Sequence, residues 1–580
     1  MTVTPNSDTA PWDGGSRDPF QPQPPAQPPL EPVRRQSASR LRWVAALVVS
    51  LLVLGGLAVV FILANPPAAA GGVSALARYA PANSALYVEL RLDLPGDQRD
   101  AVISFMRHFP GFADPGSFDQ KVSDTLDQLL RAGDGDLSWS EDIEPWFGGQ
   151  LVFFAGELEG GQGTPQSGTA VLSVKDRAAL DRFMEKEGVA STYDASEHRG
   201  VTIWTGRLAG ERTSVAVTGD ALLISYRIED MHAALDVSAG ERNGLTDEAR
   251  FSGAMSKLLG DRLLGLYLDG EAITEMMGGV PLTGGRLPGL EQAPGIVVGQ
   301  LRAEAQHMLL EMRLLPRAGQ SLPVLPQNRS STLAAQFPAD AVGYAEMRDL
   351  GQGVKQFVSQ FLGVMGGGNG DPFPPPDIEQ FLGAPPEDFL DFLGDAALAV
   401  SADGDRYGGG LVAELTDEGV ARQRLERLVT SLRLMATFGG GLPLTIEEED
   451  HGGVTLTVLR LEEIDGDEVP FSSISLAIAN GRLLLGVDDF VTEALDRTAA
   501  DSLAGSASYA RALTAAGETN GGIFYLNMAE IRAIVEREAG QRERGQMDEF
   551  WPFFETFTQV MGTVSSDGDE LVTRFLLFVE

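Results

Sequence analysis

Histidine is the residue type in this chain best suited to chemistry near neutral pH, because its side chain gains and loses a proton there. The chain has five histidines, and two of them, His198 and His451, stand in the same motif, His-x-Gly-Val-Thr. Two histidines in matching places suit a ligand site or a proton switch, or hairpin caps that bond the backbone. The capping interpretation is favoured, because it is the commoner role of such a residue.

Acidic pairs of the form Asp-Gly-Asp could bind calcium through alternate carboxylates. An EF-hand loop, however, needs further oxygen ligands and a closing glutamate, which these segments lack. Asp-Gly is also the ordinary turn of a two-residue hairpin. The sequence therefore predicts turns and no metal site at the four places, which are 134–136, 403–405, 465–467 and 567–569.

Several catalytic classes are excluded by composition and motif. The chain has no cysteine, which removes thiol nucleophiles, iron–sulfur clusters, disulfides and cysteine-ligated zinc. It contains no G-x-S-x-G and no H-E-x-x-H motif, and the glycine run 366–370 lacks the Lys-Ser/Thr of a phosphate-binding loop. We therefore predict no catalytic residues, no cofactor and no enzymatic activity.

The elements that position these residues occur twice. The segment that begins at Pro81 resembles the one that begins at Pro338, and Tyr87 holds the same position in the first segment as Tyr344 in the second. Further blocks match in the same order: 141–148 with 387–394, 198–203 with 451–456, 214–224 with 475–485, and 266–269 with 524–527. A period of about 250 residues indicates two domains and not a solenoid of short units. Tyr87, Tyr344, His198 and His451 are thus repeat-equivalent candidates for function.

Each repeat reads as strands joined by short turns, with fewer helices between them. Strands are predicted at 85–90, 150–158, 169–174, 201–208, 213–218 and 221–226, and an apolar helix face is predicted at 354–365. This pattern favours an α+β fold: a tandem duplication of an antiparallel-sheet domain with helices packed on one face, preceded by one transmembrane helix. The predicted domains are 75–316 and 332–580, with linkers at 65–74 and 317–331.

Residues 43–64 are uncharged and predict the transmembrane helix, because a helix of that length crosses a hydrocarbon core of about 30 Å. The positive-inside rule then places residues 1–42 in the cytoplasm and residues 65–580 outside. A cleaved signal peptide is the alternative, but its apolar region is shorter. The residues that would anchor the chain are Trp43, Leu47, Leu51, Leu54 and Phe61, and those that would set its topology are Arg34, Arg35, Arg40 and Arg42.

Charge and composition restrict the partners. The net charge of −38 repels phosphate backbones, so nucleic acid is not expected as a partner. Residues 1–42 are polar and rich in proline, which predicts a disordered tail. The predicted partners are the membrane, through a single span, and an envelope protein or an apolar ligand.

The apolar span, the Pro-Ala-x-x-x-x-Tyr strand, the Trp146–Gly149 block and the His-x-Gly-Val-Thr hairpin together resemble the bacterial family catalogued as domain of unknown function 3352. The resemblance covers roughly residues 75–580. It implies a membrane-anchored extracytoplasmic protein in the membrane of a bacterial cell, and it brings no catalytic residues.

Three hypotheses for function follow from these features. The first is a single-pass membrane-anchored protein whose duplicated, non-catalytic domain binds or scaffolds. The second is a carrier of lipid or another apolar ligand in the cell envelope, held between sheet and helices. A metal-dependent hydrolase that uses aspartate and histidine is the third and the least supported.

Overall fold

Most of the chain after residue 71 is described by the structure, which is a computed structural model. The described residues are 72–114, 120–124, 127, 138–156, 167–208, 211–258, 260–270, 295–316, 322, 325–353, 355, 385, 388–404, 406–438, 444–461, 471–538 and 551–580. Residues 72–316 are called the first half below, and residues 325–580 the second half.

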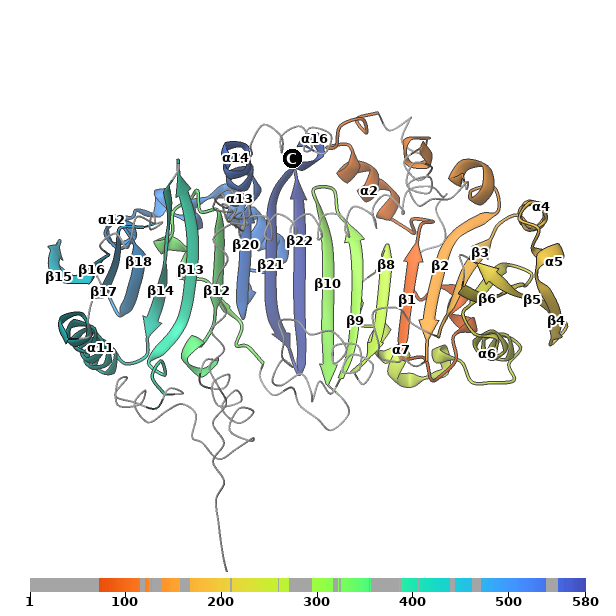
Figure 1. Cartoon of the computed structure of the whole chain (residues 1–580), viewed down its shortest axis with the longest axis horizontal. Coiled ribbons are helices and arrows are strands. Elements are labelled where there is room, and N and C mark those ends of the chain that lie inside the picture. Colours follow the sequence, from red (N-terminus) through yellow and green to blue (C-terminus); the bar gives the residue numbers. More distant parts are fainter. Residues whose placement is uncertain are drawn as a thin grey trace, which may run out of the picture. The chain divides into compact units, whose positions relative to one another are not determined.

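Within these residues, twenty strands form one antiparallel sheet (Figure 1). The strands of the first half are β1 (Leu86–Arg91), β2 (Phe147–Ala155), β3 (Thr169–Val174), β4 (Asp194–His198), β5 (Val201–Leu208), β6 (Glu211–Val217), β7 (Ala221–Ser225), β8 (Leu264–Asp269), β9 (Gly295–Ala303) and β10 (His307–Pro316). Those of the second half are β12 (Gly343–Met347), β13 (Leu393–Asp403), β14 (Arg406–Leu415), β15 (Leu444–His451), β16 (Val454–Leu461), β17 (Ser473–Ala479), β18 (Arg482–Val487), β20 (Gly522–Asn527), β21 (Phe557–Asp567) and β22 (Glu570–Val579). A separate small sheet pairs β11 (Arg329–Ser330) with β19 (Thr519–Asn520).

In the part of the chain that the structure describes, all helices except one are short. In the first half they are η1 (Ala75–Tyr79), α2 (Gln98–Met106), η3 (Trp139–Ile143), α4 (Arg177–Lys186), α5 (Val189–Thr192), α6 (Ile228–Ser238), η4 (Leu245–Asp247) and α7 (Ala249–Met255). In the second half they are η6 (Ala334–Gln336), α11 (Glu418–Phe438), α12 (Phe490–Asp496), η7 (Ala499–Asp501), η8 (Leu503–Gly505), α13 (Ala507–Ala516), α14 (Met528–Glu538) and α16 (Trp551–Phe554).

The two halves use the same strand order. From the outer edge, the first half runs β4-β5-β6-β7-β3-β2-β1-β8-β9-β10. The second half runs β15-β16-β17-β18-β14-β13-β12-β20-β21-β22. The seam between the halves is the antiparallel pair β10–β22 (Figure 1). The order therefore reads the same from either edge, as an internal two-fold axis through the seam requires.

Local sequence explains how single elements begin and bend. The carboxylate of Asp176 accepts a hydrogen bond from the backbone N–H of Ala179, which caps the first turn of α4. The pairing of β2 with β3 shifts between Phe147 and Leu151, and Gly149 in this stretch has φ +88°. The second half has a shift at the matching place, between Leu393 and Ala396. Gly148 and Gly149 of the Trp146–Gly149 block thus lie at a β-bulge.

The sheet has two faces, because side chains alternate along each strand. The tyrosine face carries Tyr87 and Tyr344, and it packs against η1, α6 and α7 in the first half and against η6, α12 and α13 in the second. The leucine face carries Leu90 and Leu398. It packs against α2 and α4 in the first half and against α11 in the second.

The expected fold class was wrong in its arrangement. The halves do not form separate sheets, because each ends on a strand whose free edge pairs with the other, β10 with β22. Helices pack on both faces of the sheet and not on one, since both faces present apolar side chains that need cover.

The transmembrane helix is the second correction to the fold class. In the described parts of the chain, no helix is long and apolar enough to cross a membrane. The longest, α11, carries charged side chains such as Arg422 and Glu426 along its length. The span predicted at 43–64 and the arginines before it lie outside the described residues, as do most of the helix predicted at 354–365 and the tail 1–42.

Candidate functional site

A row of direct cross-strand partners on the tyrosine face joins the two halves. It runs from Glu89 on β1 through Gly265, Gln300 and Glu311, and across the seam to Arg574. It continues through Thr563 and Ile523 to Glu346 on β12. This polar row contains the buried carboxylates of Glu89, Glu311 and Glu346, which are 0%, 1% and 4% exposed. It is the candidate site, because buried charge is costly and its retention needs a reason.

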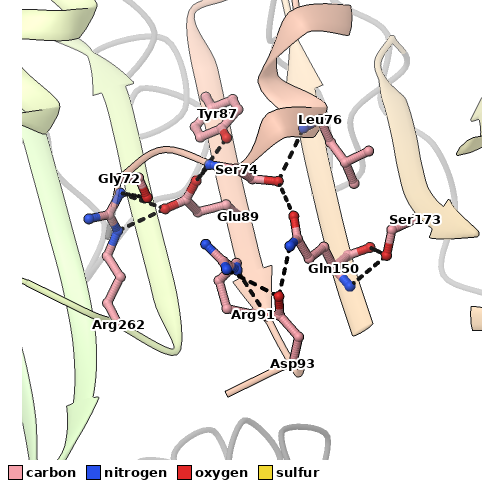
Figure 2. Close-up of polar contacts among 10 residues, drawn as sticks. All are labelled: Gly72, Ser74, Leu76, Tyr87, Glu89, Arg91, Asp93, Gln150, Ser173 and Arg262. Carbon is pink, nitrogen blue, oxygen red and sulfur yellow. Dashed lines mark hydrogen bonds and ion pairs between the residues drawn. The ribbon is translucent and has the colours of Figure 1, made fainter. Parts of the chain in front are cut away.

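The first cluster of the polar row surrounds Glu89 (Figure 2). Its Oε1 accepts from Nε of Arg262 at 2.7 Å, and its Oε2 accepts from the hydroxyl of Tyr87 at 2.9 Å and from the backbone N–H of Ser74 at 2.8 Å. Arg262 also donates to the carbonyl oxygen of Gly72 at 3.2 Å. The cluster therefore ties the segment before η1 to strand β1.

A second ion pair lies at the end of the same strand, between Arg91 on β1 and Asp93 just beyond it (Figure 2). Arg91 donates to Asp93 through Nε and Nη2, at 2.9 and 3.1 Å. Gln150 on β2 donates to the same carboxylate at 2.7 Å and accepts from the hydroxyl of Ser74 at 2.7 Å. Both charges are thus satisfied by partners that are themselves fixed in the sheet.

The second half repeats this arrangement with other partners. The hydroxyl of Tyr344 donates to Oε2 of Glu346 at 2.5 Å, and Nη1 of Arg348 pairs with the same carboxylate. Asp395, on the strand next to β12, accepts from Nη1 of Arg348 at 3.4 Å and from Arg329 at 3.2 Å. The motif Tyr-x-Glu-x-Arg therefore forms a buried cluster in each half.

The third cluster, after those of Glu89 and Glu346, surrounds Glu311 at the seam. Glu311 accepts from Nε of Arg313 at 3.0 Å and from Nε of Arg574, on the opposite half, at 2.8 Å. Arg313 reaches across the seam to Asp567 at 3.0 Å and to Glu570 at 3.2 Å. Ion pairs thus join β10 to the strands of the second half.

The chemistry available to the polar row is limited by this pairing. Burial raises the pKa of Tyr87, and the charge of Glu89 raises it further, so the phenol stays protonated and acts as a donor. The pKa of Tyr344 is raised for the same reasons, with Glu346 as the charge. Each buried carboxylate of the row is paired with an arginine, Glu89 with Arg262, Glu311 with Arg574 and Glu346 with Arg348. The row is therefore suited to holding strands together and not to attacking a substrate.

The two predicted histidines lie at the ends of outer hairpins. Nε2 of His198 lies 2.9 Å from a carboxylate oxygen of Asp236 on α6, and Nε2 of His451 lies 3.0 Å from Asp496 on α12. The ring of His198 also stacks on His232, with 4.2 Å between ring centroids. In the described part of the chain, none of their hydrogen bonds reaches Tyr87, Tyr344 or the polar row. Each histidine fastens its hairpin to a helix carboxylate, where we had expected a backbone group.

Acid is expected to lower the free energy of unfolding through His232, whose ring stacks on that of His198. Burial lowers the pKa of His232 from its ordinary value of 6.5, and the charge of His198 lowers it further. The unfolded chain therefore binds the proton more readily, so stability is lost as pH falls below about 6.5, by no more than about 1 kcal/mol. Urea unfolding at about pH 7.5 and about pH 5.5 measures this loss. His232→Gln should reduce this loss, and a loss in the variant equal to that of the wild-type protein would contradict the assignment.

Metal binding finds no support in the described residues, where no three histidine, aspartate or glutamate side chains are grouped to hold an ion. The segment 567–569 is a hairpin turn as predicted, because Asp567 pairs with Glu570. At 403–405, Asp403 pairs with Arg406, and residue 405 lies outside the described residues. The segments 134–136 and 465–467 lie outside the described residues.

Sequence reasoning missed the glutamate and arginine of each cluster. A signal was present, because Glu89 and Arg91 follow Tyr87 at intervals of two, and Glu346 and Arg348 follow Tyr344 in the same way. Side chains two apart on a strand share a face. An aromatic residue expected in the core therefore places both charges in the core, twice in one chain.

Comparisons with known proteins identify a family of unknown function. A search of curated proteins gives no match. Among solved structures, crystal form I of TP0453 is 12% identical, with 44% of this chain and 83% of that chain covered and a TM-score of 0.24. Crystal form III of TP0453 is 12% identical, with 45% and 90% covered and a TM-score of 0.24. These TM-scores are too low to equate the folds. A family model matches residues 44–580, and the chain therefore belongs to the family described as protein of unknown function (DUF3352).

Proposed function

We propose that this protein is a non-catalytic binding protein whose binding surface is the leucine face of the second half. The observation that carries the proposal is an apolar strip, defined as five side chains on that face that are 42–53% exposed. They are Met347 on β12, Leu398 and Val400 on β13, Phe524 on β20 and Phe575 on β22. Exposed apolar side chains gathered on one face are typical of interaction sites.

Strand β13 shows that the strip is more than incidental exposure. Ala397 and Ala399 are buried against the helices of the tyrosine face, while Leu398 and Val400, which alternate with them along the strand, point to the other face and are half exposed. A strand with one solvated face normally places its large apolar side chains inward and polar ones outward. The reversed pattern favours a surface kept apolar for a partner.

The rival functions have weaker support. A recess of about 280 Å³ lies between α4, α5 and β5 and is lined by Met184, Val189 and Trp204. This recess is smaller than ordinary ligand pockets, which span about 300–1,000 Å³, so it does not support a carrier whose ligand is enclosed there. An extracytoplasmic location for residues 65–580 stays a prediction.

The proposal is tested by what the full chain retains during purification. We expect native mass spectrometry of the wild-type protein to show a bound component, and Leu398→Ser with Phe524→Ser to lose at least nine-tenths of it. The matched control is Leu434→Ser, because Leu434 is also 53% exposed but lies on α11, outside the strip. Equal retention by the strip variant and the control would refute the strip as the binding surface.

A further inference from the structure

The apolar strip is centred on one straight row of residues. Leu398 pairs with Ala345, Ala345 with Phe524, Phe524 with Gly562, and Gly562 with Phe575. Large and small side chains therefore alternate across five adjacent strands. Strands lie about 4.8 Å apart, so the row is about 19 Å long.

The rows on either side of the central row are uncharged as well. One of them is Val400, Gly343, Leu526, Val560 and Leu577, and the other is Ala396, Met347, Gly522, Val564 and Thr573. Within these three rows no side chain is charged, and the nearest ion pairs of the same strands lie on the opposite face, where Glu346 pairs with Arg348 and Arg574 pairs with Glu311. A molecule bound to these rows would make apolar contacts and no ion pairs with them, so the surface suits an uncharged apolar molecule.

The size of the strip argues against a protein partner. Three rows about 6.7 Å apart along the strands and about 19 Å long cover about 250 Å². A stable protein interface needs about 800 Å² from each side. A second copy of this chain is further disfavoured by the net charge of −38, which makes two copies repel each other.

The elements around the strip also restrict what reaches it. On the outer side, α11 packs on the leucine face through Ala421 and Leu425 against Leu411 and Leu476. On the side of the seam, α2 belongs to a cluster that includes Leu310 on β10 (Figure 1). Helices about 10 Å thick therefore stand on this face on both sides of the strip, which hinders a flat bilayer or a second sheet from lying on it.

We propose that the apolar strip binds the acyl chain of a single lipid molecule. A hydrocarbon core of about 30 Å holds two layers of such chains, so one chain is about 15 Å long and fits along the row. Met347 and the two phenylalanines supply adaptable and rigid apolar contact to it. This inference rests on the proposed function, since it names the ligand class of the same surface.

The absence of cysteine from the chain permits a site-specific test. Leu398→Cys in the full chain is labelled with bimane, and a phosphatidylcholine with a doxyl group on its acyl chain is delivered from cyclodextrin as the quencher. We expect quenching that saturates at one lipid for each chain. The same label on Leu434→Cys should not be quenched. Phe524→Glu in the labelled protein should weaken binding at least tenfold, whereas Phe524→Leu should stay within about twofold, with both circular dichroism spectra unchanged.

Each other outcome overturns the inference in a recognisable way. Quenching only by phosphatidylcholine vesicles, with sedimentation of the protein, would assign the strip to a membrane surface. Loss of label exposure with rising protein concentration would assign it to a second copy. If the labelled protein shows no quenching but Leu398→Ser with Phe524→Ser still loses the component seen by native mass spectrometry, the proposed function stands and the lipid is excluded as its ligand. A thiol at position 398 that resists labelling would show the strip covered by the chain itself, and would remove both.

Discussion

Replacing Glu89 with alanine is expected to lower the free energy of unfolding by about 3–5 kcal/mol. The reason is the guanidinium of Arg262, which is 4% exposed and would keep its charge without the carboxylate that balances it. Tyr87 and the backbone N–H of Ser74 would lose their acceptor as well. Urea unfolding followed by circular dichroism measures the change.

The control for Glu89→Ala is an exposed ion pair. Arg177 and Asp181 lie one turn apart on α4 with 45% and 59% of their side chains exposed, so Arg177→Ala should cost less than about 1 kcal/mol. The double variant Glu89→Leu with Arg262→Met should recover much of the loss, because it removes both charges together. A loss below about 1 kcal/mol for Glu89→Ala alone would show that the cluster is not a structural anchor.

Local features were predictable because local chemistry determines them. Asn480-Gly481 is a dipeptide typical of two-residue hairpins, and both residues have positive φ, +52° and +71°, between β17 and β18. The order of matching blocks likewise reappears as the order of strands, with Tyr87 and Tyr344 at equivalent places on β1 and β12. Predictions of this kind need only a few neighbouring residues or a direct comparison of the two halves.

Features that depend on distant pairing were not predictable in the same way. A tandem duplication of an antiparallel-sheet domain implies two separate sheets, but β22 also pairs with β10, about 260 residues earlier. No local sequence pattern specifies which sheet edge a strand pairs with. The apolar strip was missed for a related reason, since Ala397 and Leu398 look alike in hydropathy, and only the packed helices reveal which of them is covered.

The seam shows why the two halves join to each other, and Glu311→Arg is expected to disrupt it most. The internal two-fold axis makes Glu311 and Arg574 equivalent positions, because Gln300 pairs with the first as Thr563 pairs with the second. Had both copies kept one residue, two like charges would face each other on the axis. Their divergence to glutamate and arginine instead gives a pair 2.8 Å apart.

Glu311→Arg would place a third guanidinium beside Arg313 and Arg574 where a buried carboxylate stood. The expected loss of at least about 3 kcal/mol corresponds to amide hydrogen exchange on the order of a hundredfold faster in β10 and β22. Exchange in β13 should change far less, because that strand lies away from the seam. Arg78→Glu, opposite Asp220 on the surface, is the matched control and should leave the seam amides unchanged. If β10 and β22 in the Glu311→Arg variant exchange no faster than in this control, ion pairing does not hold the two halves together.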